Sequence, residues 1–199
     1  LHKFLLNNIE IDVIPSFEHD FSEYETLIVL WPLMMPESTW NAVKKYSQTG
    51  RRIIFIGPPA QYTTEGRCTA EEFAEMAGIS VMDASVFRQY RAEYEYASWD
   101  IWFTDSKIPM RYFTIFPKEC TVLIKTDNSA IGVQNGNVEY YSFELPLTCY
   151  FNDIIESLKC FRELELSGGI ISKVLHDDDT SIVLLTSQWG KEINTSFAF

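Results

Sequence analysis

The stretch from Gly50 to Pro59 constrains the fold of this chain more than any other part of the sequence. Gly50 ends a helical pattern, and the unbroken apolar run Ile53–Ile56 that follows is typical of a parallel strand buried on both faces. Gly57 and Pro58 then stand beyond the carboxyl end of that strand, where α/β sheets commonly carry their chemistry. A nucleophile there needs a thiol or hydroxyl on a tight turn. Glycine and proline have neither, so we expect an α/β domain with an empty catalytic position.

Composition limits the number of domains and the kinds of partner. The chain has 199 residues, of which 46% are hydrophobic, and this suits one domain or one domain with a small appendage. Its formal net charge is −12, which disfavours both a nucleic-acid surface and an anionic membrane face. The sequence has no signal-peptide pattern, no membrane-spanning run and no Cys-x-x-Cys pair. We therefore expect a cytoplasmic protein with neither a metal ion nor a cofactor.

The patterning predicts an α/β order of elements. The Asn135-Gly136 dipeptide indicates a type I′ hairpin, and Thr69 with Glu72 forms the pattern of a capping box at a helix start. The expected strands are 9–13, 27–31, 53–56, 79–82, 121–124, 130–134 and 138–143, and the expected helices are 36–50, 69–78 and 152–161. We therefore predict a doubly wound, mostly parallel sheet of the flavodoxin-like kind, which is a three-layer sandwich.

Two segments depart from this α/β rhythm. Residues 84–117 are rich in aromatic side chains, and we interpret them as an insertion with one or two strands. Beyond Gly169 the pattern changes to three antiparallel strands, expected at 170–175, 181–186 and 193–199. The sequence thus predicts an α/β domain over residues 1–166 and the start of a small β domain over 167–199. Because Leu1 opens in what reads as the end of a helix, we expect the chain to be a piece of a longer protein.

Three stretches carry a resemblance to a known family. They are Tyr24–Trp31 followed by Pro32, Ala42–Pro59 with its layout of helix, glycine, strand and glycine, and Val122–Phe161 with a strand, a hairpin and a capped helix. In these stretches the chain resembles the class I glutamine amidotransferase-like fold. More narrowly, it resembles the middle domain of β-galactosidases of glycoside hydrolase family 42, the so-called trimerisation domain. The likeness covers roughly residues 1–165.

The chain also departs from the catalytic members of that fold. Aligning Gly50 with the glycine of the family puts Gly57 where the cysteine would be and Pro58 beside it. The late His-x-Glu pair is missing, since His176 is followed by Asp177. The first strand of the fold is also missing. The resemblance therefore implies the non-catalytic branch. A separate barrel domain of a β-galactosidase-like parent would then do the chemistry with two carboxylates.

Cys68 is the only cysteine whose setting favours reactivity. It lies at the start of a predicted helix and next to Arg67, and both features lower the pKa of a thiol. The sequence places no histidine near it. Cys68 is therefore a weak candidate nucleophile.

The aromatic insertion is the strongest functional candidate in the sequence. Tyr94, Tyr96, Trp99 and Trp102 lie among arginines and acids, a composition that is typical of protein interfaces. The same composition suits a sugar platform, and the aromatics could equally form a satellite core over the sheet. The sequence leaves these three readings open.

Three functions follow from these features. The first is a non-catalytic assembly domain of a larger carbohydrate-active enzyme, a β-galactosidase-like glycoside hydrolase. Its partners would be further copies of itself, as a trimer on the pattern of the family, and the barrel of its own parent chain. The second is an amidotransferase-like hydrolase that uses Cys68, and the third is a carbohydrate-binding module. The missing nucleophile at Gly57 disfavours the second.

Overall fold

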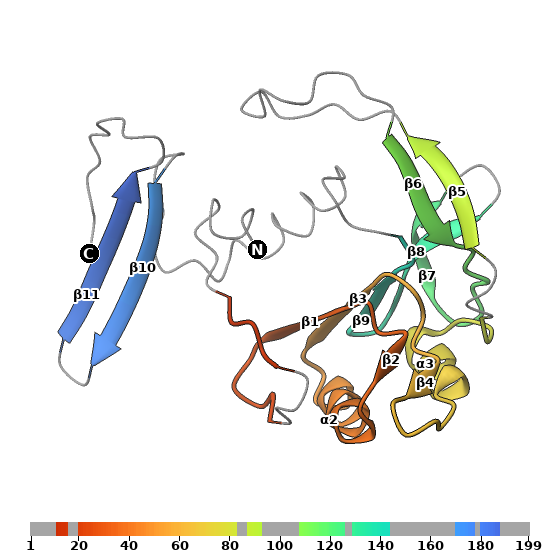
Figure 1. Ribbon diagram of the computed structural model, residues 1–199, viewed down its shortest axis with the longest axis horizontal. Coiled ribbons are helices and arrows are strands. Elements are labelled where there is room, and N and C mark those ends of the chain that lie inside the picture. The colour runs from red at the N-terminus through yellow and green to blue at the C-terminus, as the bar shows by residue number, and fades with distance from the viewer. Residues whose placement is uncertain are drawn as a thin grey trace. The chain divides into compact units, whose positions relative to one another are not determined.

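The computed structural model describes residues 11–15, 20–82, 87–92, 108–125, 129–143, 170–177 and 180–187. The chain divides into two compact units, one of Ile14–Pro146 and the other of Leu1–Val13 with Leu147–Phe199. We call the first the sheet unit and the second the hairpin unit. In the hairpin unit, β10 (Ile170–Asp177) pairs antiparallel with β11 (Thr180–Ser187), which confirms two strands of the predicted appendage (Figure 1). The third expected strand and the expected boundary after residue 166 lie outside the described residues.

A five-stranded mixed sheet forms the centre of the sheet unit, in the order β1-β3-β9-β8-β7. Its strands are β1 (Thr26–Leu30), β3 (Arg52–Ile56), β7 (Thr121–Lys125), β8 (Ala130–Asn135) and β9 (Val138–Tyr141). β1, β3 and β9 run parallel, whereas β9–β8 and β8–β7 pair antiparallel. The sheet is therefore mixed, with two parallel and two antiparallel pairs among the described strands. The predicted turn at Asn135-Gly136 folds β9 directly back onto β8, and a tight hairpin can join only antiparallel strands.

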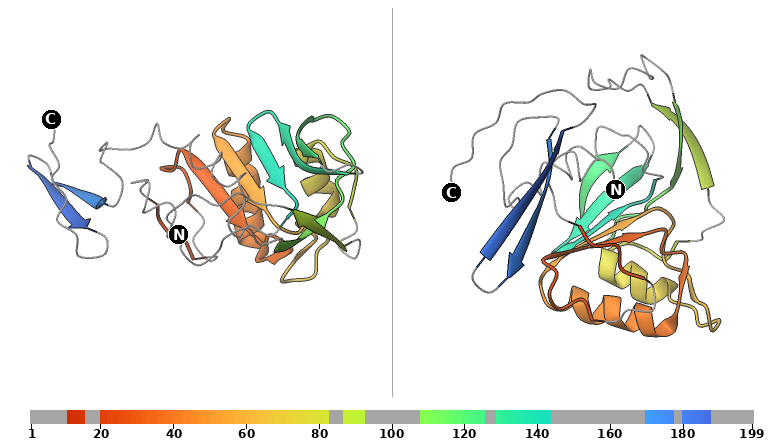
Figure 2. Two further views of the ribbon diagram at one scale, coloured as in Figure 1. Left: turned by 90° about the horizontal axis from the view of Figure 1, so that it is seen from above. Right: turned by 60° about the vertical axis from the view of Figure 1, so that its left-hand side comes forward.

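Two helices, α2 (Glu37–Ser47) and α3 (Ala70–Ala77), cover one face of this sheet (Figures 1 and 2). Phe73 of α3 lies edge-on between two rings of the sheet, with its centroid 5.2 Å from that of Phe55 and 4.9 Å from that of Tyr140. Trp40 of α2 belongs to the same core and is 0% exposed. Burying large side chains of this kind contributes about 1.5–3 kcal/mol each. The predicted helix at 152–161 lies outside the described residues.

The opposite face of β3 is buried as well. Ile54 and Ile56 alternate with the core residues Ile53 and Phe55 along β3, and all four are at most 1% exposed. This burial confirms the prediction, made from the unbroken apolar run, that the strand is covered on both faces.

The aromatic insertion contains a pair of antiparallel strands, β5 (Phe87–Ala92) and β6 (Ile108–Phe113). The prediction of one or two strands in this insertion is confirmed. A short parallel pair, β2 (Met34–Met35) with β4 (Tyr62–Thr63), was not foreseen. The strand expected at 79–82 was wrong, because Ile79 makes only an isolated bridge to Pro117.

Gly78 ends α3 in a crowded left-handed conformation, with φ +67. A Cβ at this position would lie 2.8 Å from the carbonyl oxygen of Glu119. Gly136 also has a positive φ, +58, but a Cβ there would meet nothing within 4 Å. We expect Gly78→Ala to destabilise the protein by about 3 kcal/mol, from backbone strain and steric overlap together.

Gly136→Ala is the matched control, since it adds backbone strain alone and should cost about 1 kcal/mol. Chemical denaturation of both variants measures the difference. Equal losses in the two variants would contradict the close approach of Glu119 to Gly78.

Candidate functional site

The turn that follows β3 lies where this type of sheet usually carries a nucleophile. Here the backbone of the turn is bonded to the neighbouring strand. Gly57 has φ +106, a conformation that residues with a side chain rarely adopt. Its N–H donates to the carbonyl oxygen of Tyr141 at 2.9 Å, and its own carbonyl accepts from the Tyr140 hydroxyl at 3.1 Å. Pro58 and Pro59 are buried beside it. The carboxyl ends of β3 and β9 are thus bonded to each other at the predicted catalytic position.

The neighbouring strand closes the turn from the other side. The Trp31 N–H, at the end of β1, donates to the carbonyl oxygen of Ile56 at 2.8 Å. Trp31 has φ +53, which is uncommon for a residue other than glycine, and its side chain is 53% exposed. A Cβ at Gly57 would lie 3.5 Å from the Trp31 Cα. Three parallel strand ends therefore meet at this turn through their backbones.

These contacts leave the turn without the groups that acyl transfer needs. An oxyanion hole requires backbone N–H donors aimed at a developing negative charge. The Gly57 N–H is already bonded to Tyr141, and Pro58 and Pro59 have no N–H to offer. Among the described residues, Gly57, Pro58 and Pro59 therefore offer neither a nucleophilic side chain nor a free backbone N–H.

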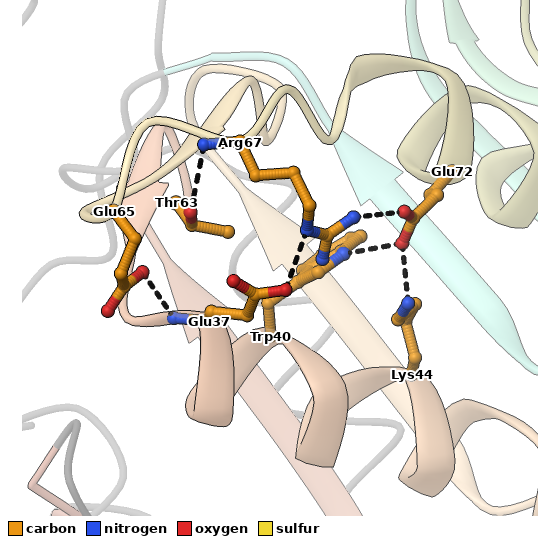
Figure 3. Close-up of polar contacts among 7 residues, drawn as sticks. All are labelled: Glu37, Trp40, Lys44, Thr63, Glu65, Arg67 and Glu72. Carbon is orange, nitrogen blue, oxygen red and sulfur yellow. Dashed lines mark hydrogen bonds and ion pairs between the residues drawn. The ribbon is translucent and has the colours of Figure 1, made fainter.

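A polar cluster lies between α2, α3 and the loop that carries β4 (Figure 3). Arg67 is at its centre, donating from Nε to a Glu37 carboxylate oxygen at 2.9 Å and from its terminal nitrogen to Glu72. The second Glu72 oxygen accepts from the Trp40 indole N–H at 2.8 Å and lies 2.6 Å from the Lys44 Nζ. Each of these charged groups has a partner of opposite charge, so the cluster joins α2 to α3.

A further carboxylate closes the end of this cluster. The backbone N–H of Glu37, in the first turn of α2, donates to a Glu65 carboxylate oxygen at 2.9 Å. The first N–H groups of a helix have no partner within the helix, and a carboxylate there also interacts favourably with the helix dipole. Glu65 therefore stabilises the start of α2 from the neighbouring loop.

Electrostatics fix Glu72 in its ionised form. Partial burial alone would raise the pKa of its carboxyl group. Hydrogen bonds from Lys44, Trp40 and Arg67 outweigh that effect and lower the pKa to about 2. A general acid or base needs a pKa near the working pH, so Glu72 is unsuited to proton transfer and serves as an anchor for the two helices.

The capping box expected at Thr69 and Glu72 was wrong. Thr69 does precede α3, but its side chain makes no capping hydrogen bond, and its hydroxyl oxygen is buried without a partner among the described residues. The Glu72 carboxylate is instead held by donors of α2 and by Arg67. Sequence reasoning missed this cluster because Lys44 and Glu72 are far apart in sequence, and no local pattern indicates their contact.

Cys68 lies beside the cluster and is exposed. The neighbouring Arg67 guanidinium, which was expected to favour a thiolate, donates instead to Glu37 and Glu72. The sheet unit contains no histidine within its described residues. The structure therefore brings no catalytic partner to Cys68 in the described part of the chain.

Several predicted site residues lie outside the described part of the chain. They are Tyr94, Tyr96, Trp99 and Trp102 of the aromatic insertion. In the residues that are described, no group of three or more His, Cys, Asp or Glu side chains could hold a metal ion. Within the same ranges, no helix is both long and apolar enough to cross a membrane.

Comparisons with known proteins find similarity in structure alone. No protein-family model and no curated protein sequence matches the chain. Among solved structures, the fold is similar to a part of Gan42B, a GH42 β-galactosidase from G. stearothermophilus, with a TM-score of 0.67 and 16% identity. The match covers 92% of this chain and 29% of that one.

Two further β-galactosidases give the same result. The enzyme from Rahnella sp. matches with a TM-score of 0.67 and 14% identity over 92% of this chain and 30% of that chain. The enzyme from Bacillus circulans sp. alkalophilus matches with a TM-score of 0.64 and 12% identity over 94% of this chain and 30% of that chain. The chain thus spans less than a third of these solved proteins and shares the fold of that part.

The low pKa of Glu72 gives a prediction about pH. Because its folded pKa, about 2, lies below the ordinary value of 4.5, the ionised carboxylate contributes stability that is fully present above about pH 5 and is lost as the pH falls towards 2. The Glu72 side chain is 35% exposed, so solvent screening reduces the contribution to about 1 kcal/mol. Glu72→Gln should therefore be less stable than the wild type at pH 7, and the difference should shrink between pH 5 and pH 2.

Glu71→Gln is the matched control, because Glu71 is exposed on the same turn of α3 and should lose almost nothing. Thermal unfolding of all three proteins across this pH range provides the measurement. A Glu72→Gln deficit that stays constant down to pH 2 would contradict the ionic character of the cluster.

Proposed function

We propose that this chain is a non-catalytic assembly domain of a larger carbohydrate-active enzyme, a β-galactosidase-like glycoside hydrolase. The observation that carries the proposal is the closed turn at Gly57. The position that supplies a nucleophile in catalytic relatives of the proposed fold here has no reactive side chain, and Tyr140 and Tyr141 already bond its backbone. In this proposal the domain acts through its surfaces, because its strand ends carry no reactive group.

The fold supports the placement in a glycoside hydrolase. The similar region of the GH42 β-galactosidases makes up 29–30% of those proteins, as expected of one domain beside a catalytic one. We assign the sheet unit to the amidotransferase-like, doubly wound class. Catalysis would then reside in a barrel domain of the same parent protein, with two carboxylates.

The proposed partner is a further copy of the same protein, in a homo-oligomer that the family resemblance suggests is a trimer. The aromatic segment with Tyr94, Tyr96, Trp99 and Trp102 supports this part by its composition, since tryptophan and tyrosine are enriched where interfaces derive most of their energy. Sugar contact by the same aromatics is the alternative use of this segment.

The second candidate, a hydrolase that uses Cys68, receives less support. A nucleophilic thiol needs a base or a cation that is free to stabilise its thiolate. Arg67, the nearest cation in sequence, is held by the carboxylates of Glu37 and Glu72. Cys68 therefore acts as an ordinary exposed thiol in this proposal.

Light scattering over a concentration series tests the assembly role. The wild-type chain should have a mass two or three times the 23.0 kDa of one copy, and the double variant Trp99→Ala/Trp102→Ala should return to the mass of one copy. Phe116→Ala is the matched control, because Phe116 is an exposed aromatic, 55% accessible, in the same insertion but outside the stretch from Tyr94 to Trp102. A wild-type chain that stays monomeric at all concentrations would refute the proposal.

Thiol labelling separates the hydrolase from the assembly domain. We expect Cys68, which is exposed, to react with a maleimide faster than the half-buried Cys120. Its modification should leave the mass of the oligomer unchanged. A thiol ester formed at Cys68 with a glutamine or ester substrate, seen by mass spectrometry and absent in Cys68→Ser, would favour the hydrolase instead.

A further inference from the structure

Trp31, the residue that follows β1, combines an unusual backbone conformation with an exposed aromatic side chain. Its φ is +53, and in the described part of the chain it is the one residue other than glycine with a positive φ. A bulky residue in this conformation is a genuine outlier, and such outliers cluster where proteins hold ligands. The Trp31 side chain is 53% exposed. The backbone thus holds an indole in solvent at the carboxyl ends of β1 and β3, the end of a parallel sheet at which ligands commonly bind.

Neighbouring residues fix the position of this indole. The Trp31 N–H donates to the carbonyl oxygen of Ile56 at 2.8 Å. A Cβ built at Gly57 would lie 3.6 Å from both Cγ and Cδ2 of the Trp31 side chain, so the ring lies beside Gly57. Two residues further on, the Leu33 carbonyl oxygen accepts from the Tyr62 N–H at 3.2 Å. A group that is already held in place loses little conformational entropy when it binds a ligand.

The stretches of chain that meet around Trp31 are uncharged. Residues 26–36 and 53–64 contain no charged side chain, although the net charge of the chain is −12. The two stretches pair with each other in β1 with β3 and in β2 with β4. Besides Trp31 they expose Met34, at 57%, and Tyr62, at 47%, which are register partners. Since neither stretch offers a counter-charge to an ion, the ligand that suits this surface is neutral.

The exposed indole offers two kinds of contact. Its ring face is apolar, and its Nε1–H is a hydrogen-bond donor. In the described part of the chain no acceptor is bonded to the Trp31 Nε1–H, whereas the buried Trp40 indole donates to Glu72 at 2.8 Å. A pyranose ring is complementary to both contacts, because it has an apolar C–H face and hydroxyl groups around its edge.

We propose that Trp31 binds a neutral pyranose, with the apolar face of the sugar stacked on the indole and a sugar hydroxyl accepting from Nε1–H. This inference rests on the proposed function, in which the parent protein acts on carbohydrate, and it gives the domain a binding role besides assembly. The role is binding without chemistry, in agreement with the bonded turn at Gly57. A single stacked sugar ring forms a weak complex, with a dissociation constant on the order of 1 mM.

Titration with methyl β-D-galactopyranoside tests the inference when the indole N–H signals are followed by NMR. We expect the Trp31 signal, identified by its loss in Trp31→Phe, to shift and saturate, while the signal of the buried Trp40 stays in place. Glycerol, which has hydroxyl groups but no ring, should leave both signals unchanged. Galacturonate has a similar ring and a carboxylate, and the negative charge of the chain should weaken its binding. A Trp31 signal that the galactoside does not shift, or that glycerol shifts equally, would overturn the proposal.

Substitutions at Trp31 separate sugar binding from a structural role. Asparagine adopts the left-handed conformation more readily than tryptophan. Trp31→Asn should therefore keep the melting temperature of the wild type and weaken sugar binding about tenfold or more. Phe116→Ala is the matched control, because Phe116 is an exposed aromatic, at 55%, on another segment and should not affect binding. Trp31→Asn that melts earlier but binds the sugar as the wild type does would give Trp31 a structural role and overturn the proposal.

The aromatic insertion is the alternative place for a sugar. Trp99→Ala/Trp102→Ala should bind the galactoside as the wild type does. Loss of binding in this double variant, with unchanged binding in Trp31→Asn, would place the sugar at the insertion and overturn the proposal.

Light scattering on the same variants distinguishes this inference from the assembly function. A wild-type oligomer that does not bind the sugar would refute the inference and keep the assembly function. Sugar binding at Trp31 in a chain that stays monomeric would support the inference and refute assembly. An oligomer that dissociates in Trp31→Asn would show that a second copy of the chain occupies this surface, and would overturn the inference.

Discussion

The hydrogen bond from the Tyr140 hydroxyl to the Gly57 carbonyl oxygen connects the core of the sheet unit to its strand ends. The Tyr140 ring lies edge-on to Phe73 in the core beneath α3, while its hydroxyl reaches the turn beyond β3. Complete burial raises the pKa of this hydroxyl well above its usual range, so it stays neutral and continues to donate. Since an unpaired buried carbonyl costs about 1–3 kcal/mol, the packing of the core and the shape of the turn depend on each other.

The charged side chains between α2 and α3 are also bonded within the fold. Arg67 and Lys44 both bond to the Glu72 carboxylate, which links α2 to α3. The Trp40 indole joins them from the core and donates to Glu72. Groups with a fixed charge and a full set of partners hold elements in place and are poor proton carriers. In the described part of the sheet unit, these contacts therefore hold α2 and α3 together.

Sequence reasoning was most successful where the determinants are local. The apolar run Ile53–Ile56 specified a strand buried on both faces, and Asn135-Gly136 specified a hairpin, because each signal lies within a few neighbouring residues. The mixed strand order could not be read in this way, since it depends on which strands become neighbours in space. Sequence reasoning did not predict the polar cluster for the same reason. Glu72 fits a capping pattern locally, but donors from α2, 28 and 32 residues away in sequence, and Arg67 bind its carboxylate.

β1 and β3 show most clearly what local sequence leaves undetermined. Both strands are runs of branched apolar residues, and the pattern indicates two equally buried strands. In the fold, Ile56 is 1% exposed, whereas its register partner Leu30 is 64% exposed, because β3 lies between two strands and β1 has a neighbour on one side only among those described. Apolar side chains that suit a central strand therefore stand at an edge.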